Sequence, residues 1–402
     1  MSKNSSRNAG RHFLQIPGPT PVPDRILRAM DTPIIDHRGP EFGKLARRAL
    51  DGIKTIFKTT NPVIIYTATG TGAWEAALVN ALSAGDRVLM VETGQFATLW
   101  KKMAEKLGLN PEFIETDWRQ GADPAVIEAK LKEDKKHEIK AVCVLHNETA
   151  TGALSPIAEI RKAIDRAGHP ALFMVDTISS LASDDYRHDE WGVDVSIGGA
   201  QKGLMLPPGM SFNALSNKAI ATSAKSNLPK SFWSWEDMIT TNKQNFFPYT
   251  PATNMLQGLV VAVDMLHEEG LDNVFARHER HAEATRRAVR AWGLEILCRD
   301  AKYYSPTITA VLMPEGHDAD AFRGLALSTF DISYGMSFGK FNGKFFRIGH
   351  LGDTNDLTIL GALAATEMSL ALCNVPHKKG GVQAAMDYIV SAHGSTARKA
   401  AE

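Results

Sequence analysis

At 402 residues the chain is long for a single hydrophobic core, so two domains are expected. Lys plus Arg and Asp plus Glu both number 45, and the zero net charge gives no electrostatic reason to expect nucleic acid or an anionic membrane as a partner. Three separated cysteines without a C-x-x-C pair argue against disulfides and a metal site. The lack of a long apolar run argues against a membrane span or a secretory signal. The cytoplasm is therefore the expected location.

The proline-rich segment at 17–23, PGPTPVP, predicts extended chain, because proline disrupts a helix. Short apolar runs and amphipathic stretches then alternate. They predict strands at 63–66, 87–92, 112–115, 140–145, 171–176 and 193–199, and helices at 41–58, 72–82, 95–107, 124–132 and 157–168. Uninterrupted apolar runs are typical of strands covered on both faces, which indicates an α/β domain with a mainly parallel sheet.

The pattern changes after about residue 255. Long helical stretches at 254–270 and 273–293 are followed by predicted strands at 305–314 and 344–352, which indicates a smaller α+β unit. The connecting helix could belong to either unit. We expect an N-terminal extended segment over 1–22, a large domain over 23–280 and a small C-terminal domain over 281–402.

A strand-to-helix turn lies in TATGTGAWEAAL at 67–78. Its small residues would let backbone N–H groups cradle a phosphate at the helix N-terminus, although an ordinary capped turn explains the pattern equally well. Gly70 and Gly72 also match the first two glycines of a dinucleotide fingerprint, and Glu92 lies at the position of the acid that binds the ribose. The third glycine would fall at Glu75, which argues against nicotinamide binding.

Three other predicted strand ends carry polar groups, and ligands of parallel sheets bind at such ends. Asp176 ends one strand, Lys202 follows another 26 residues later, and HNETATG at 146–152 supplies Thr149 after a third. Taken singly, Asp176 could be an acid in an ordinary ion pair, Lys202 a solvated loop residue, and the segment at 146–152 a polar loop. Together with a phosphate cradle they are the parts that hold pyridoxal phosphate, in which the lysine forms a Schiff base and the acid pairs with the pyridinium nitrogen.

Eight segments, in chain order, extend this pattern from about residue 13 to 375. They are IPGPTPVP, DHRGPEF, TGTGAWEAAL, HNETATG, VDTISS, QKGLMLPPG, FPYTPATN and FRIGHLGD. In this order they resemble the alanine/serine–glyoxylate aminotransferases, which are class V aminotransferases of the fold-type I pyridoxal-phosphate enzymes. The resemblance implies that fold, with a mainly parallel large domain and a smaller C-terminal α+β domain.

The resemblance also implies residue roles. Lys202 and Asp176 would be catalytic, and both would contact pyridoxal 5'-phosphate. The other cofactor-binding residues would be Thr69, Gly70, Thr71, Phe96, Thr149, Gln201, Tyr249 and Thr250, and the substrate-binding residues would be Gly18 and Arg347. In the family the segment like FPYTPATN reaches the neighbouring subunit's phosphate site, which implies a homodimer with shared active sites. Phe247 and Ala200 depart from common family residues and leave the substrate preference open.

The implied reaction moves an amino group from serine to glyoxylate, giving glycine and hydroxypyruvate. Alanine and aspartate remain open as donors, because no residue visibly selects a side chain. A cysteine desulfurase would need a cysteine on a mobile loop, whereas Cys143 falls in a predicted strand. A nicotinamide-dependent dehydrogenase is the competing hypothesis from another class, and a non-catalytic scaffold has no support because no expected catalytic position is lost.

Overall fold

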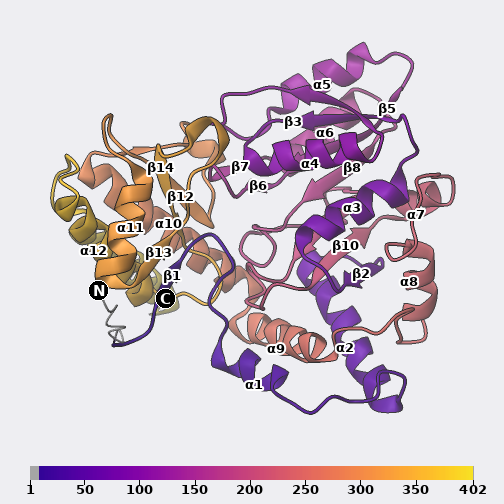
Figure 1. Ribbon diagram of the computed structural model, residues 1–402, viewed down its shortest axis with the longest axis horizontal. Helices are drawn as coiled ribbons and strands as arrows, with labels where there is room; N and C mark the ends of the chain where they lie inside the picture. The colour runs from indigo at the N-terminus through magenta and orange to yellow at the C-terminus, as the bar shows by residue number, and fades with distance from the viewer. Residues whose placement is uncertain (1–8, 402) are drawn as a thin grey trace, which may run out of the picture.

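A computed structural model describes residues 9–401, which form a larger and a smaller body (Figure 1). The larger body contains a seven-stranded sheet. Its strands, in spatial order, are β2 (Val63–Tyr66), β10 (Ser211–Leu215), β9 (Val195–Gly199), β8 (Leu172–Asp176), β5 (Ile139–Leu145), β3 (Arg87–Val91) and β4 (Asn110–Ile114). Only β10 runs antiparallel to its neighbours, so the predicted mainly parallel sheet is confirmed.

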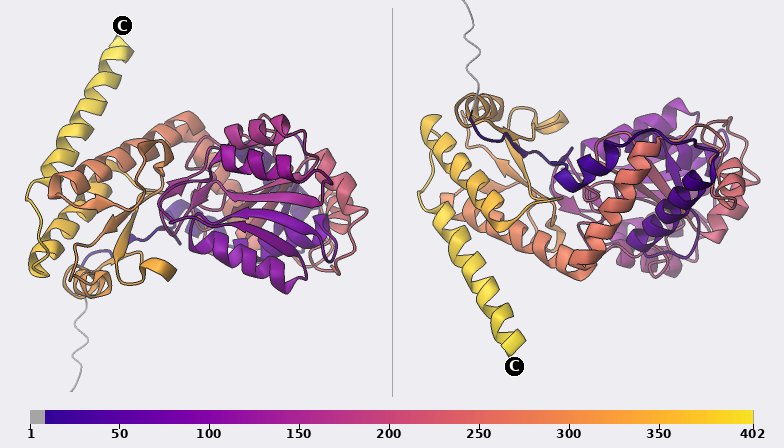
Figure 2. Two further views of the ribbon diagram at one scale, coloured as in Figure 1. Left: turned by 90° about the horizontal axis from the view of Figure 1, so that it is seen from above. Right: turned by 90° about the horizontal axis from the view of Figure 1, so that it is seen from below.

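Helices cover both faces of this sheet (Figure 2). They are α1 (Asp24–Met30), α2 (Pro40–Phe57), α3 (Gly70–Ala81), α4 (Gln95–Lys106), α5 (Pro124–Glu133), α6 (Ile157–Arg166), α7 (Asn217–Ser223), α8 (Trp235–Asn242) and α9 (Thr253–Glu269). Every residue of β2, β8, β9 and β10 is buried. Burial on both faces is the physical reason for the uninterrupted apolar runs in the sequence.

The smaller body is an α+β unit, as predicted. Its antiparallel sheet has the order β11 (Glu295–Ile296), β12 (Ile308–Leu312), β14 (Phe345–Gly349), and its helices are α11 (Ala319–Phe330), α12 (Asp356–Leu372) and α13 (Gly381–Ala401). The N-terminal strand β1 (Phe13–Gln15) pairs in parallel with β13 (Ile332–Tyr334), so the start of the described chain packs on this body. A two-stranded hairpin, β6 (Asn147–Glu148) and β7 (Ala153–Leu154), follows β5.

Helix α10 (Leu271–Trp292) joins the two bodies. Val274 packs in the hydrophobic core of the larger body, whereas Ala284 and Trp292 pack in the core of the smaller one. Because α10 packs against the core of the larger body at one end and against the core of the smaller body at the other, a domain boundary between residues 280 and 281 remains our proposal. Residues 1–8 of the expected N-terminal segment lie outside the described chain. Among residues 9–401, no helix is long and apolar enough to cross a membrane.

Candidate active site

The carboxyl ends of β5, β8 and β9 lie at one edge of the sheet, because these strands are parallel neighbours. Leu145 at the end of β5 pairs with Asp176 at the end of β8, and Asp176 pairs with Ile197 of β9. Lys202 follows three residues after β9 ends at Gly199. The topology therefore brings together the acid, the lysine and the HNETATG loop, which the sequence placed at three separate strand ends.

Lys202 is buried, and its Nζ donates a hydrogen bond of 2.7 Å to the carbonyl oxygen of Pro17. Gly18 has a φ of +124°, and a Cβ built there would lie 2.5 Å from Lys202 Nζ. Glycine is therefore required both for the backbone angle and for the space that the lysine occupies. Burial, followed by the charge of Arg347, lowers the pKa of the Lys202 amine to about 7.

Asp176 is also buried, and both carboxylate oxygens are engaged. Oδ1 accepts the backbone N–H of Ile178 (2.7 Å), and Oδ2 accepts the indole N–H of Trp74 in α3 (2.6 Å). Burial raises the pKa of this carboxyl to about 7, while the positive charge of Lys202 lowers it. Lys202 and Asp176 are thus close enough to influence each other's protonation.

The N-terminus of α3 follows the turn at which the sequence predicted a phosphate site. Thr69 is the N-cap in extended conformation and makes no side-chain capping bond, and Thr69 and Thr71 are exposed. The first N–H groups of a helix lack intrahelical partners, so this end is suited to an anion. Gly70 is buried against Ile178, which leaves no room for a Cβ.

Gln201 supplies a buried polar atom to the same region. Its Oε1 has no hydrogen-bond partner among the described residues, and a Cβ on Gly199 would lie 3.3 Å from it. Gly199 and Gly70 both pack against Ile178, so Gln201 and the start of α3 lie near the same side chain. A buried unpartnered amide oxygen has a desolvation cost, which is typical of a position that binds a ligand.

Arg347 of β14 is buried beside the HNETATG loop. Its Nε donates to the carbonyl of Met336 (2.8 Å) and its Nη1 to the carbonyl of Thr149 (2.7 Å). It forms no ion pair with any carboxylate that the structure describes, and burial lowers its pKa to about 9. Its hydrogen bonds go only to neutral carbonyls, although the nearby Glu148 carboxylate acts to raise its pKa. Because no described carboxylate pairs with it directly, Arg347 is suited to bind an anion.

Phe96 lies in the first turn of α4, whose N-terminus is capped by Glu148. The buried Glu148 carboxylate accepts the N–H groups of Phe96 (3.3 Å), Ala97 (3.1 Å) and Ala150 (2.9 Å). Burial raises the pKa of Glu148 to about 7. Glu148 and Trp74 both belong to segments that the sequence analysis selected, but neither was assigned a role, because the sequence does not reveal which distant atoms they contact.

Thr149 is oriented by a hydroxyl pair: its Oγ1 donates to Ser179 Oγ at 2.7 Å. No described hydrogen bond joins Tyr249 or Thr250 to Lys202 or Asp176. Tyr249 stacks on Phe232, its buried hydroxyl has no described partner, and Thr250 is exposed. Phe247 packs edge-on against Phe42 in the core.

Residues 12–339 match the family model described as aminotransferase class-V. The chain belongs to this family. Among curated proteins it is 48% identical to a serine–glyoxylate aminotransferase of Hyphomicrobium methylovorum, over 93% of this chain and 94% of the relative. It is 44% identical to an L-aspartate–glyoxylate aminotransferase of Paracoccus denitrificans, over 96% and 98%. Among solved structures, pyridoxamine–pyruvate aminotransferase from Mesorhizobium loti is similar with a TM-score of 0.90 and 27% identity, over 96% and 99% of the two chains.

Membership of the class-V aminotransferases confirms the fold-type I expectation and implies pyridoxal phosphate as the cofactor. The residues present fit that cofactor: a buried amine for its aldehyde, a buried acid for its ring nitrogen, and an unpartnered amide oxygen beside a helix N-terminus. No group of metal-binding side chains occurs among the described residues.

The competing hypotheses fit this site poorly. Glu92, the acid that a nicotinamide site would need, is buried and already accepts the indole N–H of Trp118 (2.9 Å) and pairs with Lys340 Nζ (2.8 Å). Cys143, the only cysteine of the larger body's sheet, lies inside β5, and burial raises the pKa of its thiol. Neither residue is available for a ribose or for nucleophilic attack.

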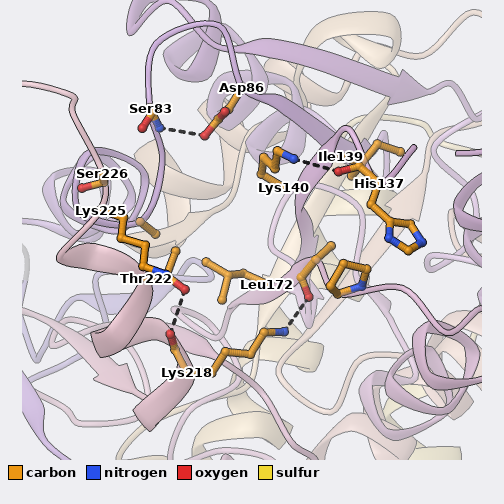
Figure 3. Close-up of a pocket in the computed structure, with 13 residues that line it drawn as sticks. Ser83, Asp86, His137, Ile139, Lys140, Leu172, Lys218, Thr222, Lys225 and Ser226 are labelled. Carbon is orange, nitrogen blue, oxygen red and sulfur yellow. Dashed lines mark hydrogen bonds between the residues drawn. The ribbon is translucent and has the colours of Figure 1, made fainter. Parts of the chain in front are cut away.

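A separate cavity of about 380 Å³ opens at the amino ends of β5 and β8 (Figure 3). It is lined by Ile139 and Leu172, the first residues of these strands, and so lies at the sheet edge opposite Asp176. Two of its lysines are engaged with backbone carbonyls: Lys218 Nζ donates to Ala171 (2.9 Å) and Lys140 Nζ to His137 (2.8 Å). None of the expected cofactor-binding residues lines this cavity.

Proposed function

We propose that this class-V aminotransferase transfers the amino group of a small amino acid, with serine as the first candidate, to glyoxylate. The products are glycine and a 2-oxo acid, which is hydroxypyruvate when serine is the donor. Relatives named serine–glyoxylate aminotransferase support this choice, and the relative named L-aspartate–glyoxylate aminotransferase keeps aspartate as an alternative. Alanine is the third candidate.

The observation that carries the proposal is the buried Arg347 guanidinium. Its hydrogen bonds go only to carbonyl oxygens, and it lies close enough to Lys202 to lower the pKa of the lysine amine. An α-carboxylate is common to every amino acid and 2-oxo acid, and a guanidinium binds a carboxylate in a planar, two-bond geometry. We assign substrate binding to Arg347 and to Gly18, whose missing side chain leaves space beside the Lys202 amine.

Bound pyridoxal phosphate supplies a ring that takes up the negative charge developing at the substrate Cα. The Schiff-base role expected of Lys202 is part of the proposal: its amine holds the cofactor aldehyde, and when free it accepts the proton of the substrate Cα. Because burial and Arg347 lower its pKa to about 7, a large fraction of this amine is unprotonated at neutral pH. Pro17 O is placed to orient the free amine.

Asp176 is assigned to hold a proton on the ring nitrogen. Its two hydrogen-bond donors, Trp74 Nε1 and Ile178 N, fix the carboxylate and lower its pKa against the effect of burial. A protonated ring nitrogen next to the carboxylate would lower the pKa further, because an opposite charge favours the ionised form. The acid and the ring nitrogen would therefore stabilise each other's charges, and the burial of Asp176 would strengthen the interaction.

The remaining roles concern cofactor placement. We assign the phosphate to Thr69, Gly70, Thr71 and Gln201, and contacts with the ring to Phe96 and Thr149. Tyr249 and Thr250 are proposed to complete the phosphate site of a second subunit in a homodimer. The unpartnered Tyr249 hydroxyl and the exposed Thr250 support that arrangement. We keep the cytoplasm as the proposed location, on the basis of three free cysteines.

Two measurements test this function. Borohydride reduction of the holoenzyme and peptide mapping should place the cofactor on the peptide that contains Lys202, and a label elsewhere contradicts the assignment. A steady-state comparison of serine, alanine and aspartate as donors to glyoxylate should show glycine formation, with serine the best substrate. No glycine from any of the three donors would overturn the proposed function.

A further inference from the structure

We infer that Phe338 is a specificity-determining residue that limits the donor side chain to a small, uncharged group. This inference rests on the proposed function, because it uses the positions assigned to the substrate carboxylate and to the cofactor ring. Phe338 is not among the site residues predicted from the sequence. The residue lies in the loop between β13 and β14, within the small body, and is half-buried.

Phe338 contacts both residues that frame the substrate. The guanidinium carbon of Arg347 lies 4.7 Å from the centre of the Phe338 ring. The Phe96 ring meets the Phe338 ring edge-on, with centroids 5.9 Å apart and an interplanar angle of 78°. Phe338 therefore contacts both Arg347, which we assign to the substrate carboxylate, and Phe96, which we assign to the cofactor ring, and we place the donor side chain next to it.

The loop that carries Phe338 is fixed to the larger body. Lys340 Nζ pairs with the buried Glu92 carboxylate (2.8 Å) and donates to the carbonyl of Thr116 (3.0 Å). Gly339 packs so closely on Trp118 that a Cβ there would lie 2.5 Å from the indole ring. Within the loop, Ser337 Oγ accepts the N–H of Gly343 at 2.7 Å. Because contacts from both bodies hold the loop, Phe338 forms a wall of fixed position.

The chemistry of this wall favours some donors over others. The Phe338 ring offers no hydrogen-bond donor to a polar side chain, and its face is already in contact with the Arg347 guanidinium. The β-carboxylate of aspartate would lose water at this ring without gaining a partner, which costs free energy. A serine or alanine side chain is small enough to avoid that cost. The inference thus favours serine or alanine over aspartate.

The test compares Phe338→Ala with Phe341→Ala as a matched control. Phe341 belongs to the same loop but packs on Phe345 (centroids 6.1 Å apart) and Trp118 (6.5 Å), away from Arg347. The measured quantity is kcat/KM for serine, aspartate and phenylalanine with glyoxylate. In Phe338→Ala, kcat/KM for phenylalanine and for aspartate, each divided by kcat/KM for serine, should rise at least about tenfold, as expected for a changed apolar pocket. In Phe341→Ala both ratios should stay unchanged.

Each outcome bears on a defined claim. If the wild type forms glycine from serine but the ratios of Phe338→Ala equal those of the wild type, the inference about Phe338 is wrong and the proposed function stands. If the wild type forms no glycine from serine, alanine or aspartate, the proposed function fails and the inference fails with it. If Phe338→Ala does not fold, Phe338→Leu provides the same comparison. We then expect a smaller rise in the ratio of kcat/KM for phenylalanine to kcat/KM for serine. An unchanged ratio would again overturn the inference.

Discussion

The indole N–H of Trp74 donates a hydrogen bond of 2.6 Å to Asp176 Oδ2, which ties the first turns of α3 to the end of β8. The bond lowers the pKa of a carboxyl whose pKa burial raises to about 7. Since α3 also begins with Gly70 and Thr71, this one contact couples the acid of the site to the proposed phosphate-binding turn.

Replacing Trp74 by Phe should remove this bond and keep most of the apolar packing. We expect a loss of about 1.5–3 kcal/mol in the free energy of unfolding, the usual contribution of a hydrogen bond to a charged group, and weaker cofactor binding. Urea unfolding and cofactor titration measure the two effects. The control is Trp100→Phe, because Trp100 stacks on Trp74 but its buried Nε1 has no described partner. Equal losses in both variants would show that the hydrogen bond contributes nothing specific.

Replacing Gly18 by Ala should block the position of the Lys202 amine. The new Cβ would lie 2.5 Å from Nζ, so the lysine must move and attachment of the cofactor should fall at least about tenfold in rate, a barrier increase of roughly 1.4 kcal/mol. Gly209→Ala is the control, since Gly209 has a similar φ of +130° but nothing within 4 Å of a Cβ. Both variants bear the backbone cost, and only Gly18→Ala should lose the absorbance of the bound cofactor.

The lowered pKa of Lys202 predicts a pH dependence of cofactor attachment. The unprotonated amine is the nucleophile, so the rate at which the apoenzyme reacts with pyridoxal phosphate should rise with pH to a midpoint near 7, far below the 10.5 of an ordinary lysine. Because Arg347 is the second cause of the lowered pKa, Arg347→Gln should move this midpoint upward. A stopped-flow absorbance series measures it, and an unshifted midpoint would contradict the electrostatic link.

The same pKa has a consequence for stability, with a sign that follows from linkage. Between about pH 7 and 10.5 the unfolded Lys202 binds a proton that the folded residue has released. Stability should therefore increase with pH across this range through Lys202, and the increase should be absent in Lys202→Met apoenzyme. Thermal melts of both apoproteins at matched pH values provide the comparison, and parallel curves would contradict it.

Replacing Glu148 by Gln should disturb two parts of the site together. The carboxylate accepts three backbone N–H groups, whereas an amide offers one oxygen and brings its own N–H₂, so at least one buried donor loses its partner. We expect destabilisation of about 1–3 kcal/mol and a higher KM for both substrates, because Phe96 and Thr149 flank the lost contacts. Asp123→Asn, at the exposed N-cap of α5, should leave KM unchanged. An unchanged KM in Glu148→Gln would limit Glu148 to a structural role.

The sequence predicted most of the strands that form the large sheet. The six predicted strands of the larger body all occur. Five of them are short apolar runs that are almost entirely buried, whereas β4 lies at the edge of the sheet and is half-buried or exposed along its length. Strand β10 was missed because the polar Asn213 interrupts its pattern. In the folded protein Asn213 is buried and satisfied, donating to the Ala73 carbonyl (3.1 Å) and accepting the Trp235 indole N–H (3.2 Å).

The sequence by itself determined the chemical groups of the site, since an acid, a lysine and a hydroxyl at strand ends converge whenever the strands are parallel neighbours. Only the tertiary structure decided how those groups behave. Pro17 is 185 positions from Lys202 and Trp74 is 102 from Asp176, yet each pair is hydrogen-bonded. Protonation depends on the loss of water and on charges a few ångströms away, and these are properties of packing between distant segments, so they cannot be read from local sequence.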